Sequence, residues 1–235
     1  MIPLRDNIPS RTFPFVTYIL IGANVVMFLM ELSLGSNLQR FIYIFGMVPQ
    51  KVFYAFTEAP QFIPYAIVPF FTSIFLHGGW LHLLGNMLYL YIFGDNVESA
   101  LGHFRYLIFY IGCGVAASIT HLLANPASDA PTVGASGAIA GVLGAYFLLF
   151  PRAKVVTLVP IFFFITFLEV PAILFLGLWF FIQFMSGSMS YGSAAAASGV
   201  AWWAHTGGFA VGMGYTLLRY RTIKGGRGRK AVSGA

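Results

Sequence analysis

Residues 133–150 read VGASGAIAGVLGAYFLLF, an uncharged apolar stretch that carries a serine near its start. Its length is close to the roughly 20 residues that an α-helix needs to cross a bilayer. Gly137, Gly141 and Gly144 give the predicted helix a face of small residues, which allows a neighbouring helix to approach closely. The stretch therefore predicts a tightly packed bundle of membrane helices, although such faces also occur where packing is their only role.

The composition supports the same class of protein. Hydrophobic residues make up 58% of the 235 residues and charged residues only 9%, whereas soluble domains carry roughly 25% charged residues. The apolar runs have the length of helices rather than of the alternating ten-residue strands of outer-membrane barrels. We therefore predict an all-α polytopic membrane protein. The single cysteine, Cys113, leaves no disulfide framework and no cysteine metal site.

Six membrane spans are predicted within a domain covering residues 1–220, followed by a basic tail at 221–235. Residues 38–79 are apolar but contain four prolines, at positions 49, 60, 64 and 69, which favours a partly embedded first loop over a spanning helix. No removable signal peptide is expected at residues 1–14. The predicted spans are residues 15–34, 79–93, 104–123, 133–150, 167–185 and 201–220.

The start of the fifth span does not follow from length alone, because residues 155–185 are too many for one straight span. We expect residues 155–164 to lie at the membrane interface and the helix to begin near Phe167. Glu169 and Pro171 would then fall in its first turn, where a carboxylate and a missing N–H are both tolerated. If Glu169 lay in the middle of the membrane instead, it would be a candidate functional residue.

Basic residues predict the orientation of the chain. With a cytoplasmic N-terminus, eleven lysines and arginines fall on the cytoplasmic side and only Arg40 and Lys51 outside, as the positive-inside rule requires. Both termini are then cytoplasmic. The basic tail lacks interleaved aromatic residues, so we expect it to contact membrane lipids and not nucleic acid.

Four polar residues lie in the first turns of the second, fourth and sixth spans, which run in the same direction. They are His82 and Asn86, then Ser136, then His205. Each has a simpler interpretation: a membrane serine often bonds to a carbonyl of the preceding turn, and a lone histidine could serve proton or substrate transport. Their shared depth, near the outer face, instead favours the wet pocket of a hydrolase.

Three separated segments carry a resemblance to a known family. HGGWLHLLGN at residues 77–86, GASGA at 134–138 and AHTGGFAVG at 204–212 resemble the signature segments of the rhomboid intramembrane serine proteases. The resemblance extends from the first span to the sixth and implies a six-transmembrane-helix rhomboid-like bundle. It also implies a bacterial inner membrane, a site toward the outer face, and substrates that are transmembrane-helix proteins entering between the second and fifth spans.

The resemblance further implies a role for each polar residue. Ser136 would be the nucleophile and His205 its general base, a dyad that forms an acyl-enzyme and needs no cofactor or metal. His82, Asn86 and the backbone N–H of Ser136 would form the oxyanion hole. Some rhomboids place an aromatic residue one turn after the serine, where this chain has Ala140, so we expect packing on the glycine face to orient His205.

Other mechanisms fit the sequence less well. No His-Glu-x-x-His spacing is present for a metalloprotease, and Asp95 and Asp129 lie in predicted loops on opposite sides, which argues against an aspartyl protease. No inverted repeat indicates a transporter. The alternative that stays open is a non-catalytic rhomboid-like protein that binds membrane helices.

Overall fold

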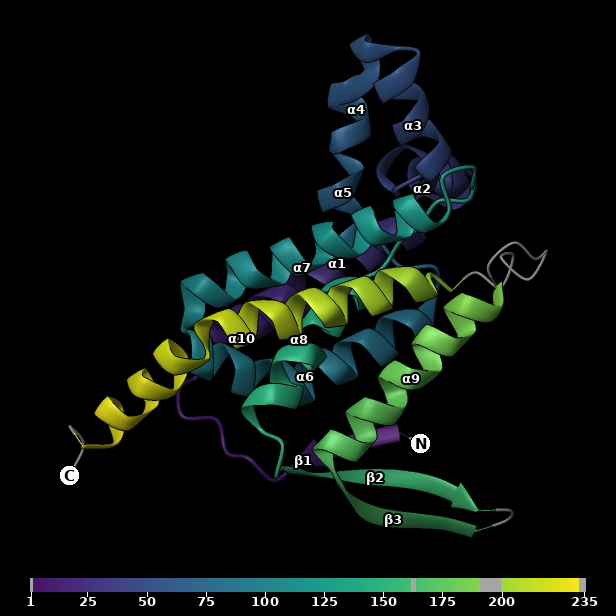
Figure 1. Cartoon of the computed structure of the whole chain (residues 1–235). Helices are drawn as coiled ribbons and strands as arrows, with labels where there is room; N and C mark the ends of the chain where they lie inside the picture. The colour runs from purple at the N-terminus through teal and green to yellow at the C-terminus, as the bar shows by residue number, and fades with distance from the viewer. Residues whose placement is uncertain (1, 162–163, 191–199, 233–235) are drawn as a thin grey trace.

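A computed structural model describes residues 2–161, 164–190 and 200–232 of the chain. Its six longest helices form a bundle, and each overlaps one predicted span (Figure 1). The predicted α-helical membrane fold is confirmed. The six helices are α1 (Phe15–Ser33), α6 (Trp80–Leu101), α7 (His103–Ala124), α8 (Ser136–Leu149), α9 (Ala172–Ser190) and α10 (Trp202–Val232).

Not all six helices have the length and apolar composition of a membrane span. Within the described ranges, α1, α7 and α9 do, and a fourth is reached if α6 and residues 60–75, which are bent by 77° from each other, count as one span. Helix α8 is apolar but has only 14 residues. Helix α10 is not among the candidate spans. That α8 and α10 cross the membrane therefore stays a prediction.

Helix α8 lies at the centre of the bundle and packs against α6, α7, α9 and α10. Its residues are buried without interruption from Gly137 to Tyr146. A Cβ atom built at Gly208 of α10 would collide with the carbonyl oxygen of Gly137, and one at Gly212 with that of Gly141. The small-residue face predicted for this helix therefore forms its contact with α10.

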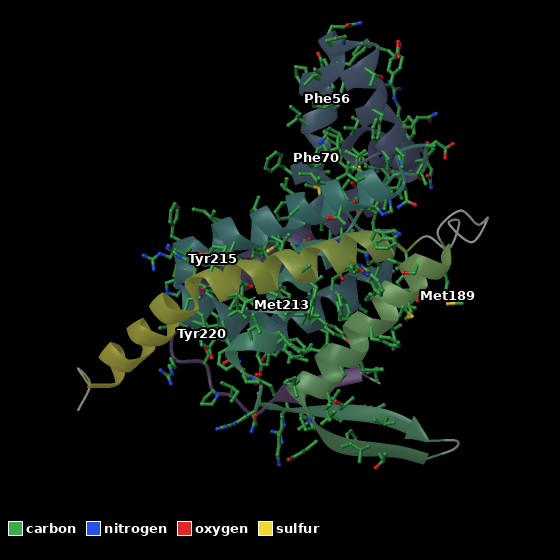
Figure 2. All side chains as sticks on the ribbon, in the orientation of Figure 1. Phe56, Phe70, Met189, Met213, Tyr215 and Tyr220 are labelled. Carbon is green, nitrogen blue, oxygen red and sulfur yellow. The ribbon has the colours of Figure 1, made fainter. Side chains whose placement is uncertain are left out.

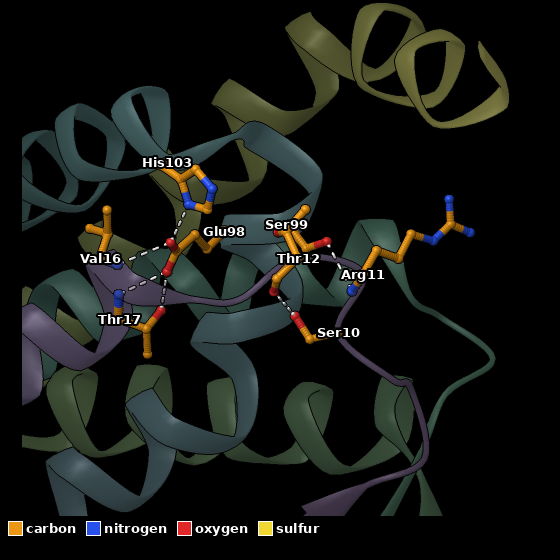
Figure 3. A network of polar contacts seen from close by, with 8 residues as sticks. All are labelled: Ser10, Arg11, Thr12, Val16, Thr17, Glu98, Ser99 and His103. Carbon is orange, nitrogen blue, oxygen red and sulfur yellow. Dashed lines mark hydrogen bonds and ion pairs between the residues drawn. The ribbon is translucent and has the colours of Figure 1, made fainter. Parts of the chain in front are cut away.

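A buried carboxylate joins α6 to the start of α1. Glu98 accepts hydrogen bonds from the backbone N–H groups of Val16 (3.0 Å) and Thr17 (2.8 Å) and from the Thr17 hydroxyl (2.7 Å), and its Oε1 lies 2.6 Å from His103 Nδ1 (Figure 3). The first N–H groups of a helix have no partner within the helix and favour negative charge nearby. Glu98 thus satisfies the beginning of α1 and ties together three helix ends.

Residues after α8 correct the predicted start of the fifth span. They form a hairpin of β2 (Lys154–Ile161) and β3 (Phe164–Pro171), and β1 (Ile2–Asp6) pairs with β2 to complete an antiparallel sheet in the order β1-β2-β3. The helix α9 begins at Ala172, so a start near Phe167 was wrong. β-Branched and aromatic residues dominate residues 154–171 and favour strands. The partner strand β1 comes from the distant N-terminus. Residues 162–163 lie outside the described part.

Glu169 is consequently neither in the first turn of a helix nor in the middle of a span. It lies on β3, where its Oε2 is 3.0 Å from Lys154 Nζ, and both side chains are more than half exposed. Exposed ion pairs of this kind add little stability. The sheet itself is attached to the bundle through Asp6, which accepts hydrogen bonds from Asn96 of α6 (3.0 Å) and from the Tyr146 hydroxyl of α8.

Two other predicted boundaries differ from the structure. Helix α6 continues past residue 93 to Leu101, and Glu98 in this extension is buried and hydrogen-bonded. Helix α10 continues past residue 220 to Val232, so most of the predicted tail at 221–235 extends this helix beyond the bundle (Figure 1). No proline interrupts it there. Residues 233–235 lie outside the described part.

The first loop folds into short helices that project from one side of the bundle (Figures 1 and 2). Prolines occupy the first or second position of several of these helices, where a missing N–H costs nothing. Aromatic side chains such as Phe56 and Tyr65 are exposed on them. This agrees with a partly embedded loop, which stays a prediction. The elements are η1 (Gly35–Asn37), α2 (Leu38–Phe45), α3 (Pro49–Thr57), η2 (Pro60–Phe62), α4 (Ile63–Ile67), α5 (Pro69–Thr72) and η3 (Ser73–Phe75).

Candidate active site

Ser136 is the first residue of α8, directly after a turn that only glycine accommodates easily. Gly134 has φ +127°, and a Cβ atom there would lie 2.6 Å from Nε2 of His82. An L-amino acid rarely adopts this backbone conformation. The turn therefore brings the chain close to α6 and places the Ser136 hydroxyl at the start of a buried helix.

His205 lies in the first turn of α10, which runs parallel to α8. Its Nε2 is 2.8 Å from Oγ of Ser136, within the distance of a hydrogen bond between a nucleophile and its base. Both side chains are partly buried. Because the glycines of α8 and α10 let the two backbones approach closely, the two polar groups meet without long side chains.

The other ring nitrogen of His205 has a partner that the sequence did not reveal. Its Nδ1 lies 2.7 Å from Oε1 of Gln183 on α9, and Gln183 is only 7% exposed. The expectation that glycine packing alone orients His205 was therefore wrong. A polar residue inside an apolar span is a candidate functional residue. Applied to the fifth span, this rule would have found Gln183.

His82 and Asn86 lie one turn apart near the start of α6 and line the same two cavities as Ser136. The backbone N–H of Gly78 donates to His82 Nδ1 (3.4 Å), so the neutral ring carries its proton on Nε2. The Asn86 amide nitrogen lies 3.0 Å from His77 Nε2. An amide has two N–H groups, and Asn86 also lines both cavities described below.

A second buried carboxylate, Glu31, supports the segment that leads into α6. The backbone N–H of His77 lies 3.2 Å from each carboxylate oxygen of Glu31 on α1, and Glu31 is 1% exposed. Glu31 and His77 together therefore hold the segment that positions Asn86. A carboxylate near the end of an apolar span was visible in the sequence, but its partner was not.

The four predicted site residues line one cavity of about 790 Å³. They also line a second cavity of about 300 Å³, which lies between α6 and α9 and reaches Tyr89 and Trp179. Ser136 and His205 thus line both cavities. Within the described residues, no group of three or more His, Cys, Asp or Glu side chains is arranged to hold a metal ion.

A family comparison decides the relationship of the chain. The family model for the Rhomboid domain matches residues 64–222, which is more than half of the sequence. The chain belongs to the rhomboid family. The matched range contains α6 to α9 and most of α10, and with them all four predicted site residues and Gln183.

Several rhomboid relatives align with parts of this chain. "Rhomboid protease GluP" of Bacillus subtilis is 35% identical over 133 residues, covering 56% of this chain and 24% of the relative. "Rhomboid-like protein 11, chloroplastic" of Arabidopsis thaliana is 33% identical over 121 residues, covering 51% and 40%. "Rhomboid protein 1, mitochondrial" of Saccharomyces cerevisiae is 40% identical over 91 residues, covering 37% and 26%. The chain thus spans less than half the length of these relatives.

Proposed function

We propose that this rhomboid-family chain is an intramembrane serine endopeptidase with Ser136 as nucleophile and His205 as general base. The observation that carries the proposal is the 2.8 Å distance between Ser136 Oγ and His205 Nε2, at a cavity inside a membrane bundle. A relative named as a protease aligns with more than half of the chain. The proposed substrates are proteins with a transmembrane helix.

The proposed reaction follows the usual steps of serine acyl transfer. His205 Nε2 accepts the Ser136 proton while Oγ attacks the carbonyl carbon of the scissile peptide bond. The tetrahedral intermediate collapses when His205 gives this proton to the departing amine, which leaves an acyl-enzyme on Ser136. A water molecule then attacks the ester, again with His205 as base, and releases the second product.

The developing oxyanion needs donors beside Ser136. The second N–H of Asn86, Nε2–H of His82 and the backbone N–H of Ser136 are proposed to fill this role. We expect Asn86→Ala and His82→Ala each to lower kcat by about 10²-fold, the usual effect of losing one such donor. Initial rates with a single-spanning model substrate measure this. Asn37→Ala is the control, because Asn37 is exposed in the first loop. An unchanged kcat for Asn86→Ala would show that Asn86 is not part of the oxyanion hole.

Substrate entry is proposed between α6 and α9. The 300 Å³ cavity is lined by Gly85 and Tyr89 on α6, by Trp179 on α9 and by Ser136 itself. An intact helix hides its carbonyl groups in internal hydrogen bonds, so the substrate must unwind near the bond to be cut. Raising the helicity of that region with leucine or alanine runs should therefore slow cleavage, and faster cleavage would contradict this requirement for unwinding.

The proposed orientation places both termini in the cytoplasm and the site toward the outer face of a bacterial plasma membrane. The lysine and arginine distribution supports the orientation, whereas the bacterial compartment comes from the family resemblance, since the relatives include chloroplastic and mitochondrial proteins. The cysteine of an Asp129→Cys variant should react with a membrane-impermeant maleimide in intact cells. The cysteine of a Pro151→Cys variant should react only after permeabilisation. Cys113 is buried and can remain. The reverse pattern would overturn the orientation.

A fluorophosphonate probe tests the function directly, because it reacts covalently with an activated serine. We expect the purified protein to be labelled at Ser136, identified by peptide mass spectrometry, and to cleave a single-spanning substrate in detergent or liposomes. Folded protein that shows neither labelling nor cleavage would support the non-catalytic, helix-binding alternative.

A further inference from the structure

The imidazole of His205 has a different polar partner at each ring nitrogen. Nε2 is 2.8 Å from Ser136 Oγ on α8, and Nδ1 is 2.7 Å from Gln183 Oε1 on α9. The ring of Trp179, also on α9, lies 5.9 Å from the imidazole between centroids. Three helices therefore determine how this ring sits.

Charged groups do not provide an alternative acceptor for Nδ1. Within the described residues, the titratable side chains that share a cavity with His205 are His82 and Tyr89 on α6 and His121 on α7. Across the described ranges, no carboxylate forms a hydrogen bond or ion pair with His205. Gln183 thus occupies the position that an acidic residue holds in a Ser-His-Asp triad.

We propose that Gln183 is a positioning residue that accepts the Nδ1–H of His205 and holds the imidazole in the tautomer that catalysis requires. The inference rests on the proposed protease function. A neutral imidazole carries one N–H. Only the ring protonated at Nδ1 presents a free electron pair at Nε2, which must take the Ser136 proton.

An amide suits this position better than a carboxylate does. Burying an unpaired negative charge is costly, whereas a buried amide needs only hydrogen-bond partners. Gln183 is 93% buried on an apolar helix, since its exposed fraction is 7%. The amide therefore selects the tautomer without a charge, at the expense of weaker stabilisation of the imidazolium that forms in the reaction.

The placement of Gln183 also separates it from the dyad. Ser136 and His205 lie on α8 and α10, whose backbones are in contact at glycines. Gln183 lies on α9, beside the cavity between α6 and α9. The hydrogen bond from Nδ1–H of His205 to Gln183 thus depends on the position of α9. If α9 is displaced, Nδ1 loses this partner while the Ser136–His205 pair stays intact.

Two substitutions with opposite expectations test this role. Gln183→Met has similar length but no acceptor, and we expect kcat to fall by about 10²-fold, at the lower end of what general-base catalysis contributes, with little change in KM. Gln183→Glu restores an acceptor and adds a negative charge. It should keep a higher kcat than Gln183→Met and shift the acidic limb of the kcat profile to higher pH, because a carboxylate stabilises the imidazolium.

Ile182→Met is the matched control, because the neighbouring Ile182 lies on the same helix and is 48% exposed. The Ile182→Met enzyme should behave as wild type. A role in packing alone would alter thermal stability but leave the kcat of Gln183→Met no lower than that of Gln183→Glu. That result, or an unchanged kcat in folded Gln183→Met, overturns the inference even when Ser136→Ala is inactive. Continued cleavage by Ser136→Ala would instead remove the proposed function. If Gln183→Met does not fold, Gln183→Leu, which also lacks an acceptor, takes its place in this comparison.

Discussion

Replacing Ser136 with alanine is expected to lower kcat for a single-spanning membrane substrate by about 10⁶-fold, and His205→Ala by a similar factor. The hydroxyl and the imidazole are 2.8 Å apart and would act in the same proton transfer. Removing either one stops that transfer. The double variant Ser136→Ala/His205→Ala should therefore be no slower than either single variant.

The measurement is the initial rate of substrate cleavage in liposomes, together with the thermal unfolding midpoint of each variant. Ser188→Ala is the matched control, because this serine is exposed on α9 and donates to the Phe184 carbonyl (2.9 Å). Its rate should equal that of wild type. Cleavage by folded Ser136→Ala at a wild-type rate would eliminate the serine mechanism.

Adding one methyl group at Gly208 is expected to disrupt both the fold and the site. A Cβ atom there would collide with the carbonyl oxygen of Gly137, next to Ser136, and would lie 3.3 Å from the Ala140 Cβ. Overpacking of this kind costs about 1–3 kcal/mol. The helices can relieve the clash only by separating beside the dyad, and a displacement of about 1 Å can reduce the rate about 10²-fold.

Gly214→Ala on the same helix is the matched control, with an expected effect of opposite sign. A Cβ atom at Gly214 meets no atom within 4 Å, and alanine is favoured over glycine inside a helix by up to about 1 kcal/mol. Thermal unfolding should therefore show a lower midpoint for Gly208→Ala and an equal or higher one for Gly214→Ala. Equal stability and activity for the two variants would contradict a tight α8–α10 contact.

Much of the site could be predicted because its residues sit in recognisable local patterns. Polar side chains are rare in apolar spans, and Ser136 and His205 each stand at the start of one. The direction of successive spans alternates, so the second, fourth and sixth must present their first turns at the same end. His82 and Asn86 were found by the same reasoning, since they are four residues apart on one helical face.

The partners of these residues could not be predicted in the same way. Gln183, Glu31 and His77 act through contacts between helices that are far apart in the sequence, and no periodicity reports which of them meet. The hairpin was missed for a related reason. Its strands contain the same apolar residue types as a membrane helix, and part of what stabilises it is pairing with residues 2–6, about 150 residues away.

Composition and apolar periodicity by themselves determined that this chain is a helical membrane protein, because burying backbone in lipid leaves few other solutions. They also determined which helix ends bring polar groups to one depth. Tertiary structure alone decided how the helices are rotated against one another, and hence that His205 meets Ser136 on one side and Gln183 on the other. Such choices depend on packing between complete helix surfaces, which a single segment of sequence does not contain.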